Sequence, residues 1–162
     1  MKIRTRVKAE LAQVDMAIEQ YKEKRGYYPP DNPSKPGSNS LYYELVGTTF
    51  DGTSKFSPLN GDQPILKPSI SSAFGADGFI NSNWKADDAK NFFPTLKTAQ
   101  QVNTNLIPGV GLLGISVKGP SGTFCPLFYN SSNPTHKQNG FDVWVVVTLS
   151  GQTQTLGNWK KD

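Results

Sequence analysis

The first twenty-five residues carry the pattern that most constrains the fold of this chain. Apolar side chains recur there at spacings of 4, 4, 3, 4 and 3, which is the period of an α-helix and leaves no strand alternative. Gly26 then offers a left-handed cap, and the pair Pro29-Pro30 prevents the helix from continuing. The sequence therefore predicts one helix over residues 1–25, roughly 36 Å long at 1.5 Å per residue. Its apolar positions are Ile3, Val7, Leu11, Val14, Ile18 and Tyr21.

The composition favours one domain that combines this helix with β-structure. The 162 residues are enough for a single domain with a substantial core. The 15 glycines and 12 prolines indicate many turns, which a helical bundle would not need. The net charge is +4, but the basic residues are scattered and no aromatic-basic motif of a nucleic-acid-binding module accompanies them. We therefore expect no nucleic-acid partner.

Strand patterns are concentrated in the last third of the chain. The alternation from Phe141 to Leu149 puts every second residue on one face, and Ser150-Gly151 after it is a hairpin signal. Strands are predicted over residues 112–117, 124–129, 141–149 and 152–156.

The first half of the chain after the helix gives weaker signals. Residues 41–46 predict a short second helix that begins after a cap at residues 38–40 and ends at Gly47. Residues 48–83 show no dominant period, so we expect irregular structure with short extended pieces near Ile65-Leu66 and Phe79-Ile80.

Residue types that carry catalysis are sparse. The single histidine, His136, lies in a polar loop without a G-x-S-x-G motif elsewhere, so a solvated or structural role is expected. The single cysteine, Cys125, excludes an internal disulfide, and its apolar neighbours predict a buried, unreactive thiol. The sequence therefore predicts no catalytic residue and no cofactor-binding residue, and we expect that the protein is not an enzyme.

Two parts of the chain together resemble one family. Residues 7–30 resemble the segment that follows the membrane span in type IV pilin-like proteins, with Ala17-Ile18, Tyr21, Gly26, Tyr28 and Pro29 at the matching places. The C-terminal part is similar to the G-type major pseudopilin of type II secretion. Its matching residues, in the same order, are Tyr129, Pro134, His136, residues 140–144 (GFDVW) and residues 156–159 (LGNW).

The resemblance implies a pilin-like α+β fold, in which the long N-terminal helix packs on a C-terminal antiparallel sheet. It implies a single domain over residues 1–162, with the helix at 1–25, an enlarged, irregular and variable middle region at 26–125, and a β region at 126–162. The C-terminal half of the apolar stripe would pack on the sheet, and its N-terminal half would face neighbouring subunits in a helical filament. The subunit-packing residues expected in this way are Ile3, Val7, Leu11, Val14, Ile18 and Tyr21.

The function implied is that of a structural subunit of a type II secretion pseudopilus, a filament that drives protein export across the outer membrane. The partners would be further copies of the chain, minor pseudopilins and the inner-membrane secretion platform. A membrane-spanning helix upstream of residue 1 would anchor the domain in the periplasm of a Gram-negative-type bacterium. The alternatives are a type IV pilin-like filament subunit for adhesion or motility, and a soluble periplasmic binding protein or enzyme.

A structural calcium ion is the one metal that the resemblance brings into question. The G-type subunit binds Ca²⁺ partly through a Ser and an Asp, and the matching positions here hold Val145 and Thr155. Calcium needs several hard oxygen ligands, usually including carboxylates. We therefore expect no metal site and a plain hairpin in its place.

Overall fold

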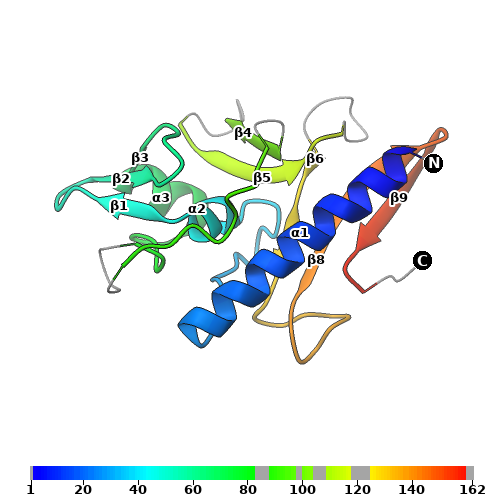
Figure 1. The fold of residues 1–162 in the computed structure, drawn as a ribbon, viewed down its shortest axis with the longest axis horizontal. Helices are drawn as coiled ribbons and strands as arrows, with labels where there is room; N and C mark the ends of the chain where they lie inside the picture. Colours follow the sequence, from blue (N-terminus) through cyan, green and yellow to red (C-terminus); the bar gives the residue numbers. More distant parts are fainter. Residues whose placement is uncertain (1, 83–87, 98–99, 104–108, 118–124, 160–162) are drawn as a thin grey trace.

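The computed structural model describes residues 2–82, 88–97, 100–103, 109–117 and 125–159. A long helix, α1, crosses the front of the molecule diagonally, and three antiparallel sheets of three strands each lie behind and beside it in the described part of the chain (Figure 1). The expected α+β class, with an N-terminal helix and antiparallel sheets, is confirmed.

Helix α1 spans Lys2–Arg25, so the helix predicted from the apolar stripe is confirmed. It ends as the sequence indicated, because Gly26 takes a φ of 90° and its N–H closes the last turn onto the Lys22 carbonyl at 2.7 Å. The last turn carries three basic residues, which the negative end of the helix dipole favours. They are Lys22, Lys24 and Arg25.

The C-terminal sheet has the order β7-β8-β9. The alternation predicted from residue 141 onward is confirmed, since Val143, Val145 and Val147 of the long central strand are fully buried. Ser150 and Gly151 both take positive φ, 53° and 79°, which is the backbone of a tight type I′ hairpin. The strands are β7 (Phe128–Asn130), β8 (Asp142–Leu149) and β9 (Gln152–Gly157).

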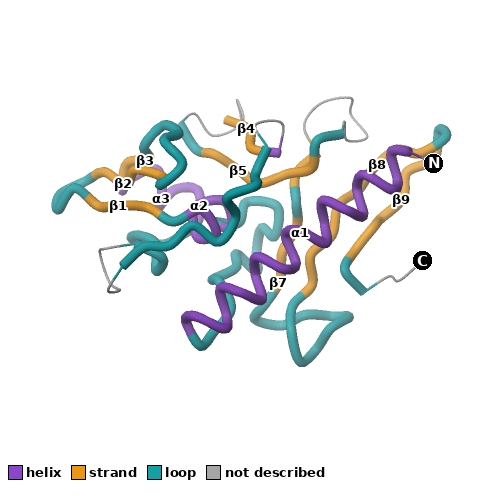
Figure 2. The backbone as a smooth tube through the Cα atoms, in the orientation of Figure 1, coloured by secondary structure: helices purple, strands orange, loops and turns teal. Residues whose placement is uncertain are grey.

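Helix α1 lies against this sheet, in contact with β8 and β9 (Figure 2). Its apolar stripe and the inner side chains of β8 belong to one continuous hydrophobic core. Removal of both apolar surfaces from water is the main force that holds helix and sheet together.

A second sheet, with the order β4-β5-β6, continues the core beside α1. The strand predicted over 124–129 is split between two sheets at Leu127, whose N–H donates to the Leu113 carbonyl at 3.1 Å. Residue 124 lies outside the described part. The strands are β4 (Gln101–Asn103), β5 (Gly111–Ile115) and β6 (Cys125–Pro126).

The middle region is more regular than the sequence indicated. The short helix over residues 41–46 is confirmed as α2 (Leu41–Val46), and the extended piece expected near Ile65-Leu66 is confirmed as a strand. The irregular structure expected for the rest of 48–83, of which residue 83 lies outside the described part, is wrong where two further strands and a helix form. This stretch contains a three-stranded sheet and a helix. The strands are two to four residues long, which is too short to show a period in the sequence. The elements are β1 (Thr48–Phe50), β2 (Lys55–Pro58), β3 (Ile65–Leu66) and α3 (Lys67–Phe74).

An aromatic cluster holds this middle region together. The extended piece expected near Phe79-Ile80 forms no strand. Phe79 instead stacks on Tyr43 of α2, with ring centroids 4.7 Å apart. Phe56 of β2 meets Phe79 edge to face at 5.3 Å. Rings at these distances add to the stability that burial alone supplies, which explains how so short a sheet keeps its place.

Candidate functional site

The predicted subunit-packing residues of α1 fall into two groups. Five of the six are buried within the single chain, from 0% to 4% exposed. Only Ile3 is accessible, with 48% of its surface exposed. Val7 and Leu11 are buried within the single chain, whose strands β5, β8 and β9 pack against α1, so no neighbouring subunit is needed to explain their burial. Their expected contact with a neighbouring subunit stays a prediction. The buried five are Val7, Leu11, Val14, Ile18 and Tyr21.

The end of α1 is fastened to the C-terminal sheet by the residues that follow it. The Tyr129 hydroxyl donates to the Pro29 carbonyl at 2.7 Å, and the Tyr28 ring meets Phe141 edge to face at 5.0 Å. The Asp31 carboxylate accepts hydrogen bonds of 3.0 Å from the N–H groups of Ser131 and Ser132. The two sequence motifs that carry the family resemblance therefore contact each other.

Asp142 holds the loop that precedes β8. Its carboxylate is 2% exposed and accepts the backbone N–H groups of Thr135, His136 and Lys137 at 2.8–2.9 Å. Burial raises the pKa of this carboxyl, but the hydrogen bonds outweigh burial and leave the pKa below its usual range. Asp142 is therefore a structural anchor for the loop.

His136 has partners that the sequence did not reveal. Its Nδ1 lies 3.3 Å from the Asp142 carboxylate, and its ring stacks on Trp159 with centroids 3.7 Å apart and planes at 3°. Its side chain remains 45% exposed. The structural role expected for this histidine fits these contacts.

The Trp159 ring packs directly on the backbone of Gly157. A Cβ atom placed on Gly157 would stand 2.5 Å from the Trp159 indole ring, so this position must lack a side chain for the ring to lie where it does. The indole therefore fills the space between the Gly157 backbone and the His136 ring.

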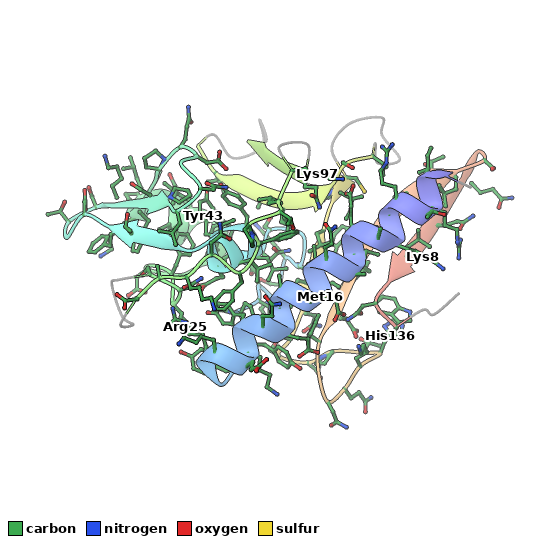
Figure 3. The ribbon with its side chains drawn as sticks, viewed as in Figure 1. Lys8, Met16, Arg25, Tyr43, Lys97 and His136 are labelled. Carbon is green, nitrogen blue, oxygen red and sulfur yellow. The ribbon has the colours of Figure 1, made fainter. Side chains whose placement is uncertain are left out.

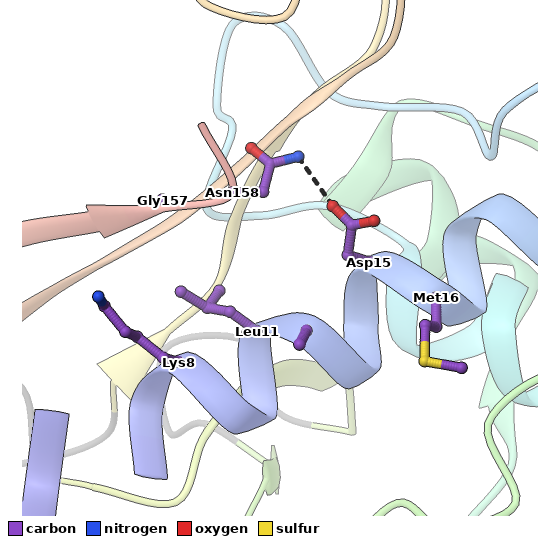
Figure 4. Close-up of a pocket in the computed structure, with 7 residues that line it drawn as sticks. Lys8, Leu11, Asp15, Met16, Gly157 and Asn158 are labelled. Atoms are coloured by element: carbon purple, nitrogen blue, oxygen red, sulfur yellow. Dashed lines mark hydrogen bonds between the residues drawn. The ribbon is translucent and has the colours of Figure 1, made fainter. Parts of the chain in front are cut away.

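Asn158 joins the same motif to helix α1. Its amide donates to the Asp15 carboxylate at 3.1 Å (Figure 4). The same amide donates to the Phe141 carbonyl at 3.0 Å. Its backbone N–H donates to Val143, which continues the β8-β9 pairing past Gly157. One side chain thus connects the helix, the central strand and the C-terminal end of β9.

A groove opens beside this contact, between α1 and the end of β9. It has a volume of about 430 Å³ and faces solvent (Figure 4). Leu11 lies along it, and Met16, which Figure 3 also labels, is 61% exposed. Lys8 and Asp15 stand toward its two ends along the helix. The lining residues are Lys8, Leu11, Ala12, Asp15, Met16, Gly157 and Asn158.

The two positions matched to calcium ligands in the resembled family do not converge. Val145 is fully buried in the core, whereas Thr155 is exposed on β9. Among the residues described, no three His, Cys, Asp or Glu side chains cluster in a way that could hold a metal ion.

The sequence did not reveal a buried carboxylate in the middle region, that of Glu44. Glu44 of α2 is 1% exposed and accepts 2.9 Å hydrogen bonds from the Tyr21 hydroxyl and from the N–H groups of Ile80 and Asn81. Burial raises its pKa, and these hydrogen bonds offset only part of that rise. The Asn81 side chain accepts from Arg25 at 2.8 Å, so the set binds α1 to the middle region. A lone Glu in an apolar helix is the only local signal for it.

Glu10 and Cys125 lie at the contact between α1 and the second sheet. The Glu10 carboxylate is 2% exposed and accepts hydrogen bonds from the backbone N–H and the hydroxyl of Ser116. Cys125 is fully buried, and burial together with the charge of Glu10 raises the pKa of its thiol to about 11. A thiol with so high a pKa is a poor nucleophile at neutral pH.

Comparison with known protein families, with curated proteins and with solved structures finds no match to this chain. In the described part of the chain, no helix combines the length and the apolar character that crossing a membrane requires.

Proposed function

We propose that this chain is a structural subunit of a type II secretion pseudopilus. One observation carries the proposal. Residues 7–30 and the C-terminal part, which resemble the pilin-like family separately, meet through the Tyr129–Pro29 hydrogen bond and the Asn158–Asp15 hydrogen bond. The long helix laid on an antiparallel sheet, with its termination sequence fastened to that sheet, is the arrangement that the resemblance implies.

In this proposal the work of the protein is mechanical. Copies of the chain join at the base of a helical filament, which lengthens and pushes folded proteins through an outer-membrane channel. A secretion ATPase supplies the energy, and this subunit catalyses no reaction. Contacts that repeat from one copy to the next without closing a ring build such fibres.

The membrane anchor is part of the same proposal. Helix α1 would continue upstream into an apolar segment of about 20 residues that spans the inner membrane and leaves the described domain in the periplasm. A full gene that encodes no such segment would contradict the proposal.

Deletion of the gene in its own host tests the function directly. The proposal expects exported proteins to accumulate in the periplasm and to return to the medium when the gene is restored. Overproduction of the full-length protein together with its secretion platform should yield filaments visible by electron microscopy. Normal export in the deletion strain would reject the pseudopilus.

A filament for adhesion or motility is the second candidate. The middle region supports it with two exposed apolar residues, Leu59 at 40% and Leu66 at 52%, which a surface contact could cover. The deletion strain distinguishes the two functions, because loss of attachment or surface movement with unchanged export would support this candidate instead.

A further inference from the structure

We propose that the groove between α1 and β9 receives the Ile3 side chain of a second copy of this chain, with the two α1 helices parallel and offset by nine residues. The inference rests on the proposed filament, which requires contacts between copies but does not specify them. The two surfaces of the contact are Ile3 of one copy and the groove of the next.

Both surfaces of the proposed contact carry exposed apolar side chains. Ile3 and Met16 are the large apolar residues of α1 that stay exposed, at 48% and 61%. Met16 lines the groove together with Leu11 and Ala12, so the groove offers apolar neighbours for an aliphatic side chain. Contact between copies would remove both exposed side chains from water at once.

The positions of the two surfaces on the helix are the second argument. Ile3 and Ala12 are nine residues apart, which at 3.6 residues per turn is two and a half turns. The two residues therefore lie on opposite sides of α1. One copy can insert its Ile3 into a neighbour while its own groove receives another copy, so the contact is heterologous and does not close.

The charges of α1 favour a parallel over an antiparallel arrangement of the two helices. The first turn contains no acidic residue, and Arg6 is exposed. If Ile3 of one copy lies beside Ala12 of a parallel neighbour, Arg6 lies about one helical turn from Glu19 along the axis, and Glu19, which is exposed, is on the same side of its helix as Ala12. In an antiparallel pair, Arg6 would lie level with Ala9 instead, close to the basic Lys8. The parallel arrangement therefore places unlike charges together, at an axial offset of roughly 13 Å.

Disulfide cross-linking tests the contact. Ile3→Cys and Ala12→Cys are introduced into separate chains, and Cys125, which is buried, is left in place. Mild oxidation of the mixture, as purified chain and in intact cells that carry the full gene, should give a dimer of the two variants. Ala9→Cys is the matched control, because Ala9 is an exposed alanine of the same helix that does not line the groove. Its yield with Ile3→Cys should be at least about fivefold lower, since a disulfide tolerates only a narrow range of Cα separations.

The double variant Ile3→Cys/Ala12→Cys tests whether the contact is open. It should form a ladder of dimers, trimers and longer species on a non-reducing gel. A product that stops at the dimer would show a closed twofold contact and overturn the proposal.

A charge exchange tests the direction. Arg6→Glu should lower the cross-linking rate about threefold to fivefold, and adding Glu19→Arg to the neighbouring chain should restore it. Equal rates with Ala9→Cys and Ala12→Cys, or no rescue by the exchanged charge, would overturn the register. Filaments that form in cells without the Ile3–Ala12 cross-link would reject this contact and leave the proposed function standing, whereas an absence of filaments together with normal export would reject the function itself.

Discussion

The Tyr129 hydroxyl donates a 2.7 Å hydrogen bond to the Pro29 carbonyl, across 100 residues of sequence. Both groups are buried, and Ser131 donates to the same carbonyl at 3.3 Å. The bond fixes where the chain goes after α1 ends, and through it the helix keeps its position on the C-terminal sheet.

Removal of this hydroxyl should weaken the fold measurably. Tyr129→Phe keeps the ring and deletes the donor, so we expect the free energy of unfolding to fall by about 1 kcal/mol. Urea unfolding followed by circular dichroism measures it. Tyr27→Phe is the control, because Tyr27 is 49% exposed and its change should be close to zero. Equal stability of Tyr129→Phe and the wild type would contradict the role assigned to this bond.

Asp142 should stabilise the fold mainly above the pKa of a free carboxyl group. Its pKa is lowered in the folded state, so its contribution is present above the unfolded pKa of about 4 and is lost as pH falls through the folded value. Asp142→Asn should cost about 2 kcal/mol at neutral pH, and the cost should shrink toward acid. Asp88→Asn, at an exposed position, is the control. A cost that does not vary with pH would contradict this interpretation.

Glu44 should show the opposite dependence. Burial raises its pKa in the folded state, so its contribution is fully present below the unfolded pKa and is lost as pH rises through the folded value. As pH rises above the unfolded pKa of about 4, the wild type should therefore lose stability relative to Glu44→Gln, which does not titrate. Unfolding in urea across this range measures the difference. The control is Glu23→Gln, on the exposed side of α1, whose stability should vary with pH as that of the wild type does. If the stability of Glu44→Gln also varies with pH as that of the wild type does, the prediction fails.

Cys125 should be inert in the folded protein. With a pKa of about 11 and no exposed surface, the thiol should not react with an aromatic disulfide reagent at neutral pH within the time that an unfolded control needs for complete reaction. The control is the same chain in denaturant, which should release one thiol equivalent. Rapid reaction of the native protein would show that the β5-β6 region opens readily.

Gly157→Ala should displace the Trp159 ring. The added methyl group would stand 2.5 Å from the indole, so the ring must leave its stack on His136, at a cost of about 1–3 kcal/mol. Tryptophan fluorescence and urea unfolding report the change. Gly140→Ala is the matched control, since its Cβ would meet atoms only at 3.7 Å or more. An unchanged emission spectrum would contradict the packing described for Trp159.

The sequence by itself determined the elements whose side chains repeat with a fixed period. Helix α1, its end at Gly26 and the alternation of β8 follow from burial on one face and from local backbone preferences, which a few neighbouring residues express. The Ser150-Gly151 hairpin is of the same kind, because its positive φ angles are a local requirement.

The tertiary structure alone decided which distant groups meet. Glu44 became the centre of a buried hydrogen-bond set, and His136 acquired Asp142 and Trp159 as partners, because separate segments were brought together. The same holds for Val7 and Leu11, which periodicity placed on the correct face of α1 but could not assign to the chain's own sheets rather than to a neighbour. A period shows which face of a helix is buried, whereas the identity of what covers that face depends on long-range packing.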